Sequence, residues 1–517
     1  MDDSKVVRRT WRCALGNIPH CLARKDLTMR TCVSHIALGI CCLFLATGMP
    51  PAWAEEASSP VSPHRTDWFY QAGYGVFVHY LVGLQNNPEQ VHSLGRSTSW
   101  DECVREFDVE KFAQTMEEVG AGYVIFTMMQ RRREMIAPNE TFDRLTGYRP
   151  GEACATRDLV AELYEALARR DIPLMLYWTG DGPIDDPKAA KALNAGIPVT
   201  TEFVRKWSDV VAEYAQRYGP KVKGWWVDGC YRFIGYDEEK LGILAEGLRA
   251  GHPDRIIALN PGVESEVRAY SRHEDFTCGE QNRFFDMPVN RFIDGKQWHI
   301  LSYLGCARSG EGSGWGQPGT AYSKRELAEY VFDVHQRGGV VSIDVLLYRD
   351  GSLDRSQMEV LKAIRRELNE GKQRPPVPPG NKAYRKPAEL LSLDGSHRLV
   401  VNSGRHFPRL GVDGDPRTFA LAGGEWPWTF EVNLVDTTPL ERIKVTFGPG
   451  YATEFAIRVS GDHVNWQTVA EKKGHDGSPF EVKFPPVPAR YVRICGHKPD
   501  GPNQPGSQMS IAELEVY

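Results

Sequence analysis

The stretch Gly224-Trp225-Trp226-Val227-Asp228-Gly229 is the most informative part of this chain. Its apolar run is typical of a buried β-strand, and the run ends in an acid followed by glycine. A carboxylate at the carboxyl end of a strand, beside two indole rings, suits sugar chemistry. The rings offer apolar faces to a pyranose, and the acid can act as a nucleophile or a base. The alternative is an aspartate that caps the turn after the strand.

Short apolar runs of this kind recur through residues 66–370, with amphipathic stretches between several of them. The expected strands are Tyr74–Tyr80, Gly122–Met129, Pro173–Trp178, Gly224–Asp228, Arg255–Asn260, Asp275–Glu280, Trp298–Leu304 and Gly339–Leu347. The clearest expected helices are Val109–Val119, Arg157–Arg170, Thr201–Tyr218, Asp237–Ala250, Ser323–Arg337 and Asp354–Asn369. Eight β/α units predict an α/β fold, a (β/α)8 TIM-like barrel, with an irregular part between the fifth and seventh strands. A doubly wound open sheet is the alternative, but its glycine-rich phosphate loop is missing here.

The chain changes character after the predicted barrel. Residues 371–388 contain the sequence Pro-Pro-Val-Pro-Pro-Gly, which predicts a stiff linker. In residues 389–517, apolar and polar residues alternate between turns, which predicts an antiparallel β-sandwich of the jelly-roll type. The expected strands are Thr429–Leu434, Arg442–Phe447, Phe455–Ser460, Phe480–Phe484, Arg490–Cys495 and Ile511–Tyr517.

Residues 1–54 are expected to be an N-terminal extension and a secretory signal rather than part of the fold. Arg30 precedes the short apolar run Ile36–Met49, and Ala52-Trp53-Ala54 forms a small-x-small cleavage site. We therefore expect cleavage after Ala54 and a periplasmic or extracellular protein without a membrane span in its mature form. An uncleaved N-terminal anchor is the alternative.

The composition limits the classes of partner. The 517 residues carry a net charge of −5 and show no basic stripe after the signal, which argues against a nucleic-acid partner. The cysteine spacing shows no disulfide framework, and CxxC and HExxH motifs are absent, so the cysteines and histidines predict no zinc site and no metal ligand. Nothing in the sequence indicates the oligomeric state.

The reactive groups of a TIM barrel project from the carboxyl ends of its strands. On this basis Asp228 is the expected nucleophile and Glu280 the expected acid/base, with Glu274 as the alternative a few residues upstream. Another interpretation of Glu280 is a strand-end acid paired with Arg283. The expected sugar-binding residues are His79, Tyr177, Trp178, Trp226 and Trp315. His79 could instead be a structural histidine.

The layout of the barrel resembles the retaining α-L-fucosidase family, glycoside hydrolase family 29. That family has an aromatic segment ending in Phe-x-His, similar to Phe77-Val78-His79 here. Its nucleophile lies in a Trp-Phe-Asp-Gly strand after Tyr-Gly-Pro, and Tyr218-Gly219-Pro220 precedes Trp226-Val227-Asp228-Gly229 here. The turn Arg337-Gly338-Gly339 before the last strand is also similar. The resemblance implies a retaining exo-α-glycosidase that needs no cofactor for catalysis.

This chain departs from the family at the second strand. The family has Lys-His-His-Asp-Gly-Phe there, with histidines that bind fucose, whereas this chain has Met128-Met129-Gln130-Arg131-Arg132-Arg133. The Trp-Gly after the first-strand histidine is also absent. Three consecutive arginines could meet a carboxylate or sulfate on an anionic sugar, or they could form a solvated basic loop.

The C-terminal part resembles a coagulation-factor type C, or discoidin-like, module. The resemblance rests on Phe455–Asp462, Ala489–Ile494 and Ile511–Tyr517. It implies a galactose-binding-like carbohydrate module and a structural Ca²⁺, which Asp413, Asp415 and Glu513 could hold as oxygen ligands.

Together these features predict an exported retaining glycosidase, similar to α-L-fucosidase, that removes terminal sugars from oligosaccharides or polysaccharides. Two alternatives stay open. One is a catalytically silent glycan-binding protein on the same scaffold, and the other is a glycosidase for another sugar, such as an anionic one.

Overall fold

The computed structural model describes residues 64–264, 266–288, 290–306, 313–370, 380–396, 399, 406, 408–422, 427–498 and 509–517. The predicted signal, residues 1–54, and residues 371–379 of the predicted linker lie outside the described residues. Within the described part of the chain, every helix is too short or too polar to cross a lipid bilayer. The cysteines described there are all free thiols.

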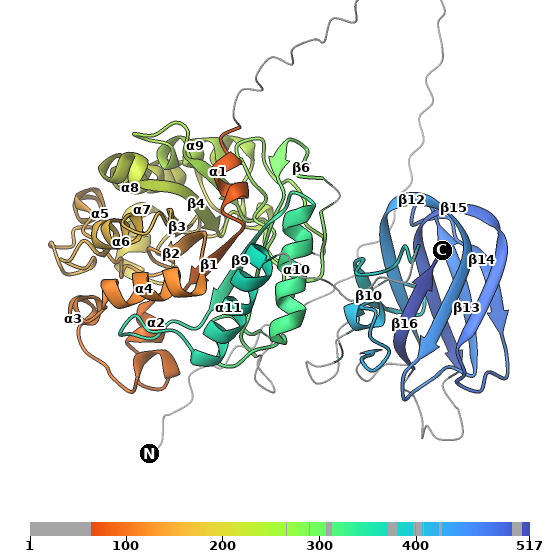
Figure 1. Cartoon of the computed structure of the whole chain (residues 1–517). Coiled ribbons are helices and arrows are strands. Elements are labelled where there is room, and N and C mark those ends of the chain that lie inside the picture. Colours follow the sequence, from red (N-terminus) through yellow and green to blue (C-terminus); the bar gives the residue numbers. More distant parts are fainter. Residues whose placement is uncertain are drawn as a thin grey trace, which may run out of the picture. The chain divides into compact units, whose positions relative to one another are not determined.

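Seven parallel strands form the first sheet, in the order β5-β4-β3-β2-β1-β9-β8 (Figure 1). They are β1 (Tyr74–Val78), β2 (Tyr123–Thr127), β3 (Leu174–Thr179), β4 (Val222–Asp228), β5 (Ile256–Leu259), β8 (His299–Tyr303) and β9 (Val340–Val345). These strands are buried along almost their whole length, because side chains pack against both faces of the sheet. The arrangement confirms the predicted TIM-like barrel.

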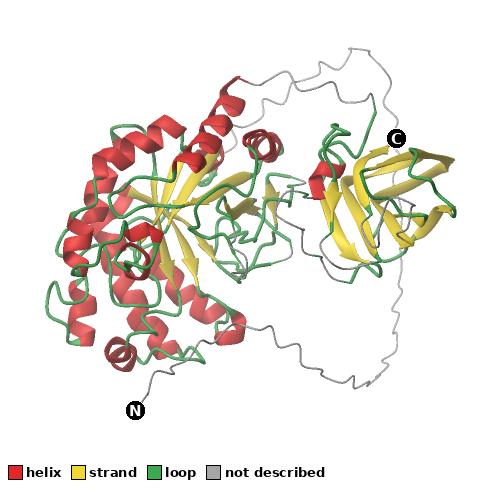
Figure 2. Ribbon diagram, turned by 90° about the horizontal axis from the view of Figure 1, so that it is seen from below, coloured by secondary structure: helices red, strands yellow, loops and turns green. Residues whose placement is uncertain are grey.

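Helices cover the outer face of this sheet (Figure 2). Their ends follow local chemistry: α4 (Val109–Val119) begins where the Asp108 side chain accepts the amide of Lys111, and it ends at Gly120, whose φ is 75°. The other long helices are α6 (Leu159–Ala168), α8 (Thr201–Tyr218), α9 (Glu238–Leu248), α10 (Lys324–Gln336) and α11 (Arg355–Glu370). All six predicted helices are present, within two residues at each end. Short helices fill the loops: α2 (Val82–Gln85), η1 (Val91–Ser93), α3 (Trp100–Arg105), α5 (Glu140–Thr146), α7 (Pro187–Leu193), η2 (Gly219–Lys221) and η3 (Arg232–Ile234).

The sequence predicted a sixth strand at Asp275–Glu280, and the structure does not form a regular strand there. The segment is extended and lies between β5 and β8, but it makes separate parallel bridges, Phe276 with Gln297 and Glu280 with Leu301. Gly279 interrupts the ladder, because its φ of 59° lies in the left-handed region. The chain before it has no helix in the described residues, and β6 (Phe292–Ile293) and β7 (Lys296–Gln297) form a small hairpin after it. The irregularity expected between the fifth and seventh strands is therefore confirmed.

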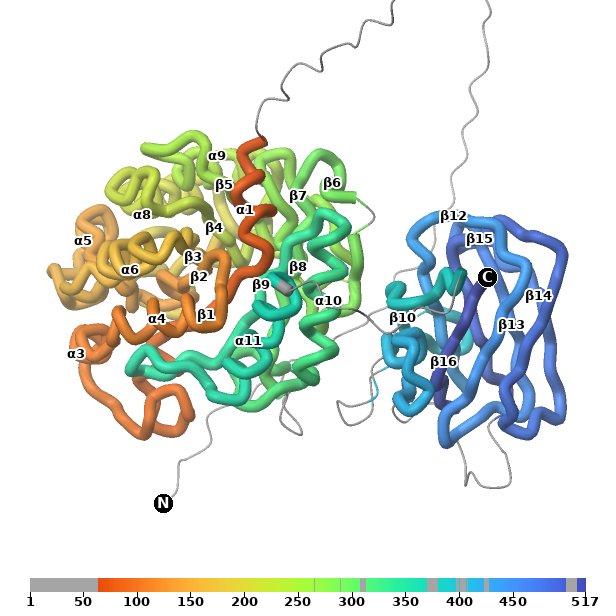
Figure 3. The backbone as a smooth tube through the Cα atoms, viewed as in Figure 1, coloured from red at the N-terminus to blue at the C-terminus, as the bar shows by residue number. Residues whose placement is uncertain are grey.

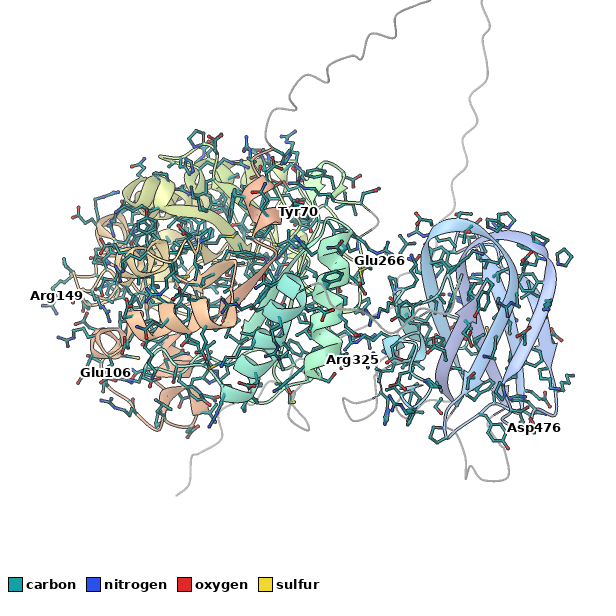
Figure 4. The ribbon with its side chains drawn as sticks, viewed as in Figure 1. Tyr70, Glu106, Arg149, Glu266, Arg325 and Asp476 are labelled. Carbon is teal, nitrogen blue, oxygen red and sulfur yellow. The ribbon has the colours of Figure 1, made fainter. Side chains whose placement is uncertain are left out.

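A short helix, α1 (Asp67–Gln71), precedes the first strand and fills the amino-terminal end of the barrel. Phe69 is fully buried there, and its ring packs 4.8 Å from those of Tyr123 and Phe276. The neighbouring Tyr70, labelled in Figure 4, also belongs to α1. Its ring stacks on that of His335 of α10 at 4.9 Å. This end is thus closed by aromatic rings, which leaves the carboxyl ends of the strands for a site.

The second sheet is antiparallel (Figure 3). Its strands are β10 (Ala388–Ser392), β11 (Ala420–Leu421), β12 (Trp428–Phe447), β13 (Glu454–Ser460), β14 (Gln467–Lys472), β15 (Phe480–Lys498) and β16 (Ser510–Val516), with η5 (Pro408–Gly411) before β11. The first half of β12 pairs with β10 and its second half pairs with β16. This exchange of partners gives the discoidin-like sandwich its two layers around one apolar core. Each long strand replaces two short strands of the prediction.

Candidate active site

A cavity of about 460 Å³ opens at the carboxyl ends of the barrel strands. Residues on or just after four strands line it: His79 follows β1, Gln130 follows β2, Tyr177 lies on β3, and Trp226 and Asp228 lie on β4. Glu280, from the interrupted sixth segment, and Trp315, from the loop after β8, complete the cavity wall. The structure thus brings together six of the eight residues predicted from the sequence.

Asp228 is held by four hydrogen bonds. Its Oδ1 accepts the backbone amide of Gly229 and the hydroxyl of Tyr231, both at 2.8 Å, and the amide nitrogen of Asn260 at 2.9 Å. Its Oδ2 accepts the hydroxyl of Tyr177 at 2.8 Å. This set of donors fixes the orientation of the carboxylate.

Glu280 lies close to Asp228. Burial raises the pKa of Glu280, and the negative charge of Asp228 raises it further, whereas a hydrogen bond from Asn260 lowers it. A buried carboxyl with a raised pKa therefore lies beside a second carboxyl held by four donors, which is the arrangement of an acid beside a nucleophile.

One side chain joins the two carboxyls. Asn260, directly after β5, donates from Nδ2 to Asp228 Oδ1 at 2.9 Å and to Glu280 Oε2 at 2.6 Å. The distance between Asp228 Oδ1 and Glu280 Oε2 therefore cannot exceed the sum of these two hydrogen-bond lengths. The side-chain oxygen of Asn260, Oδ1, accepts the backbone amide of Gly262 at 3.0 Å, and this bond turns Nδ2 of Asn260 toward the two carboxyls.

The aromatic wall of the cavity is built by alternation along the strands. Tyr177 and Trp226 point into the barrel and stack at 5.6 Å with an interplanar angle of 14°. Gln130 donates to the hydroxyl of Tyr177 at 2.8 Å, so a chain of hydrogen bonds runs from Gln130 through Tyr177 to Asp228. Trp315, from the loop after β8, lies 6.4 Å from the ring of His79.

His79 is oriented by a buried acid. Its Nδ1 lies 2.8 Å from Asp344 Oδ1, and Asp344 is fully buried on β9. The other oxygen of Asp344 accepts the amide of Gly316 at 2.7 Å, next to Trp315. This geometry leaves Nε2 of His79 for a ligand in the cavity. Asp344 therefore pairs with His79.

Two residues that the sequence placed in the site, Trp178 and Glu274, do not line the cavity, which corrects the prediction. Trp178 is fully buried on the outer face of β3, where it stacks on Trp207 of α8 at 4.6 Å. Successive strand residues face opposite ways, so Tyr177 enters the barrel and Trp178 cannot. Glu274 is 2% exposed, does not line the cavity, and accepts the amide of Tyr270 at 2.6 Å. Burial raises its pKa to about 8.

The three arginines after β2 are largely neutralised. Arg131 bonds Asp181 at 2.5 Å and holds Asp185 through two bonds at 3.0 and 3.1 Å. Arg133 bonds Asp186 at 2.7 Å. Arg132 lines the cavity with a contact of 3.8 Å to Glu134. Glu134 and Asp185 line the cavity too, so this wall carries both signs of charge.

The acids of the sandwich give a partial fit to a calcium ion. Among the described residues, no group of three or more His, Cys, Asp and Glu side chains is placed to hold a metal. However, Glu513 is 6% exposed and its Oε1 has no hydrogen-bond partner, while its Oε2 accepts the amide of Gly414 at 3.0 Å. Asp413 and Thr418 lie in the same loop and bond each other at 3.0 Å. Asp415 instead pairs with Arg417 at 2.7 Å.

Comparison with known proteins agrees with this geometry. The Alpha-L-fucosidase family model matches residues 47–370, more than half of the chain. This chain belongs to the alpha-L-fucosidase family. It is therefore a glycoside hydrolase whose substrates are oligosaccharides. The F5/8 type C domain model matches residues 396–514. No curated protein sequence matches the chain significantly.

Solved structures of two kinds resemble parts of the chain. A putative alpha-L-fucosidase from Bacteroides thetaiotaomicron is 15% identical, with 88% of this chain and 96% of that chain covered and a TM-score of 0.42. A fucosidase from Ruminococcus gnavus in complex with fucose is 14% identical, with 88% and 94% covered and a TM-score of 0.38. A chitosan-binding module from a Paenibacillus chitosanase/glucanase is 28% identical over 26% of this chain and 98% of that chain, with a TM-score of 0.23.

Sequence reasoning missed Asn260, Tyr231 and Gln130, which contact the carboxyls directly or through Tyr177. Asn260 was within reach, since it is the last residue of the predicted strand Arg255–Asn260, and polar side chains at strand ends enter such a site. Tyr231 lies three residues into a loop, and no periodicity indicates where its side chain points.

Proposed function

We propose that this fucosidase-family chain is an exported retaining exo-α-glycosidase that removes terminal α-L-fucosyl residues from oligosaccharides or polysaccharides. The observation that carries the proposal is the shared hydrogen-bond donor of Asp228 and Glu280. In retaining enzymes the two carboxyls lie about 5–5.5 Å apart, whereas in inverting enzymes a water molecule separates them by about 6.5–9.5 Å. A single amide bridging both oxygens supports the shorter separation.

In the proposed reaction Asp228 is the nucleophile. Oδ1 accepts three of the four hydrogen bonds, which leaves Oδ2, bonded to Tyr177, to attack the anomeric carbon. Glu280 donates its proton to the departing glycosidic oxygen as the bond to the anomeric carbon breaks. The resulting carboxylate of Glu280 then takes a proton from water, whose oxygen attacks the anomeric carbon and releases Asp228.

The remaining cavity residues support sugar binding. The stacked rings of Tyr177 and Trp226, and the ring of Trp315, offer apolar faces to a pyranose. His79, oriented by Asp344, can bond a sugar hydroxyl. The raised pKa of Glu280 supports its assignment as the acid, because the group then holds its proton near neutral pH. The position of Glu274 outside the cavity removes the support for it in that role.

The reaction is tested with 4-nitrophenyl α-L-fucoside. Wild type should release nitrophenol, and the first sugar released, followed by NMR, should keep the α configuration. Asp228→Ala should be inert, whereas Glu280→Ala should lose more activity on sugar leaving groups than on nitrophenol, which departs without a proton. The β anomer as first product would exclude retention.

A terminal sugar other than fucose is a second candidate substrate, because the chain lacks the family's fucose-binding histidines. Met128 and Met129, where the family has its fucose-binding histidines, are fully or almost fully buried. Arg132 lines the cavity with a side chain that is 56% exposed and could meet an anionic group. Turnover of sulfated or uronic α-glycosides with no turnover of the fucoside would favour this candidate. Glycan binding without any turnover would favour a silent binding protein.

The proposal also includes export by a cleaved signal peptide and a structural calcium ion in the sandwich. The signal pattern before Glu55 supports cleavage after Ala54, and sequencing the amino terminus of the secreted protein tests it. The unpartnered buried oxygen of Glu513, with Asp413 and Thr418 in the adjoining loop, supports a structural Ca²⁺ in the sandwich.

A further inference from the structure

The loop after β4 carries an exposed aromatic pair. Phe233, on η3, has a side chain that is 78% exposed. Its ring stacks on that of Tyr231, with centroids 5.0 Å apart and an interplanar angle of 15°. A single exposed apolar residue is ordinary on a protein surface, but this one is stacked on a ring that contacts the nucleophile. We name Tyr231 and Phe233 the aromatic platform.

Tyr231 connects the aromatic platform to the proposed catalytic carboxyls through a hydrogen bond. The Tyr231 hydroxyl donates to Asp228 Oδ1 at 2.8 Å, and the charge of Glu280 acts on the same tyrosine. The Tyr231 ring also meets the loop after β5, where a Cβ on Gly262 would lie 3.6 Å from Tyr231 Cε1. The platform therefore lies between the loops that follow β4 and β5.

The platform is held in place by backbone bonds. The amide of Val199 donates to the carbonyl of Ile234 at 2.7 Å, and the amide of Gly235 donates to that of Arg232 at 3.0 Å. Gly235 ends the turn with a φ of 108°, which a residue with a side chain rarely adopts. Phe233 is thus presented to solvent by a fixed turn next to the site.

The direction of the substrate follows from the two carboxyls. The aromatic wall of the cavity comes from β3, β4 and the loops after β1 and β8, so the terminal sugar lies on that side of Asp228. The glycosidic oxygen must lie next to the acid Glu280, and the leaving group must extend outward past it. The platform and Gly262 border the carboxyls on the β4–β5 side, outside the cavity wall.

We propose that the aromatic platform is the subsite for the leaving group, and that its ligand is the flat C–H face of a pyranose. This inference rests on the proposed function. The exposed apolar face is one ring wide, which fits a sugar ring better than a protein surface. Arg232, next to Phe233 in the chain, is 52% exposed; one of its nitrogens pairs with Glu238 at 2.9 Å, and the others are donors for sugar hydroxyls.

The test compares leaving groups that share one terminal sugar. Wild type, Phe233→Ala and Phe233→Tyr are assayed on α-L-fucosyl fluoride, on 4-nitrophenyl α-L-fucoside, and on disaccharides in which α-L-fucose is linked to each position of galactose or N-acetylglucosamine. We expect Phe233→Ala to raise KM roughly tenfold for the disaccharides and the nitrophenyl fucoside, because the ring loses its stacking partner. The fluoride has no ring to stack, so its kinetics should not change. Phe233→Tyr keeps the ring and should restore the wild-type KM.

The matched control is Phe292→Ala on the β6–β7 hairpin, a phenylalanine that is 36% exposed and does not line the cavity. It should leave all the substrates unaffected. If wild type does not hydrolyse the fluoride, the proposed function fails. If wild type hydrolyses the fluoride and Phe233→Ala changes no KM, the subsite is refuted while the function stands. An effect on the nitrophenyl fucoside alone, or no cleavage of any disaccharide, would refute a pyranose as the ligand.

Discussion

Asn260 contacts both proposed catalytic carboxyls, so one substitution tests how they cooperate. Asn260→Ala removes a hydrogen bond from Glu280 and one from Asp228. Hydrogen bonds to charged groups contribute about 1.5–3 kcal/mol, so kcat/KM should fall roughly ten- to hundredfold. The bond from Asn260 lowers the pKa of Glu280 against burial and the charge of Asp228. Without it the acid keeps its proton to higher pH, and the alkaline limb of the kcat/KM profile should move upward.

The pH profile separates positioning from folding in this experiment. Tyr231 and Cys278 also face Glu280 but keep their protons across the range measured, since burial raises the pKa of both groups. Asn282→Ala, at an exposed asparagine just beyond Glu280, is the control and should keep both limbs. An alkaline limb that stays in place in a well-folded Asn260→Ala protein would show that Asn260 does not tune the acid.

Glu274 gives a residue-scale test in which stability is measured beside activity. Its pKa is raised to about 8 by burial, against an ordinary value of 4.5. Between these values the folded protein holds a proton that the unfolded chain releases, so stability should fall as pH rises, by up to about 1.4 kcal/mol per pH unit. Glu274→Gln should flatten this decline between pH 5 and pH 8 in thermal unfolding experiments.

The activity of the same variant decides between the two candidate acids. Glu274→Gln should keep its kcat on sugar leaving groups, because the side chain lies outside the cavity, while Glu280→Gln should lose it. Loss of activity in Glu274→Gln at unchanged stability would return the acid role to Glu274.

At the scale of single residues, the strand-end position of Asp228 was enough to predict its place in the cavity. Side-chain direction was harder. Tyr177 and Trp178 are neighbours with similar chemistry, and only the register of β3 decides which one enters the barrel. The pairing of Asp344 with His79 was also out of reach, because 265 positions separate the two residues.

The interrupted sixth segment places Glu280, so strain in that element should reach the chemistry. Gly279 has a φ of 59°, and a Cβ there would lie 2.0 Å from the carbonyl oxygen of His299. Gly279→Ala should therefore cost more than about 1 kcal/mol of stability and should also lower kcat by displacing the neighbouring acid. Urea unfolding and kcat on the aryl fucoside measure the two effects.

Gly196→Ala is the control for that element, since nothing lies within 4 Å of a Cβ there and its φ is not positive. It should change neither stability nor kcat appreciably. A stable and fully active Gly279→Ala protein would show that the interruption has no role in placing Glu280.

Helices were predicted closely because their ends carry local signals. The Ser323 hydroxyl oxygen accepts the amide of Glu326, and the amide of Ser323 donates to the Glu326 carboxylate. At the start of α9 the Asp237 side chain accepts the amide of Lys240. Asp275–Glu280 was predicted as a strand from its apolar pattern, whereas the structure has only separate bridges there. The break depends on the backbone angle of Gly279, which hydrophobic patterning does not report.

Over the whole molecule, the order of a parallel barrel and an antiparallel sandwich followed from a change of hydrophobic period alone. The length of the sandwich strands did not. Residues 429–434 and 442–447 read as two strands, because turn-forming residues lie between them. In the structure β12 passes through that interval with a shift in register and exchanges its partners. Only pairing across the sheet specifies that continuity.

Calcium should act on the stability of the whole chain through the sandwich. Glu513 holds a buried oxygen without a partner beside the loop of Asp413 and Thr418, and an unpaired buried carboxyl is costly. A bound ion would remove that cost. At a calcium concentration 100 times its dissociation constant, unfolding should become about 2.7 kcal/mol less favourable, and a chelator should reverse the change.

The control variants separate a specific site from a general salt effect. Glu513→Gln should abolish the calcium response in calorimetry, whereas Glu481→Gln, on β15 and away from this loop, should preserve it. Magnesium at the same concentration should have little effect, because it demands smaller, near-octahedral coordination. Activity on a soluble aryl fucoside should hardly respond to the ion, since the proposed chemistry lies in the barrel. A calcium response that survives in Glu513→Gln would place the ion elsewhere in the chain.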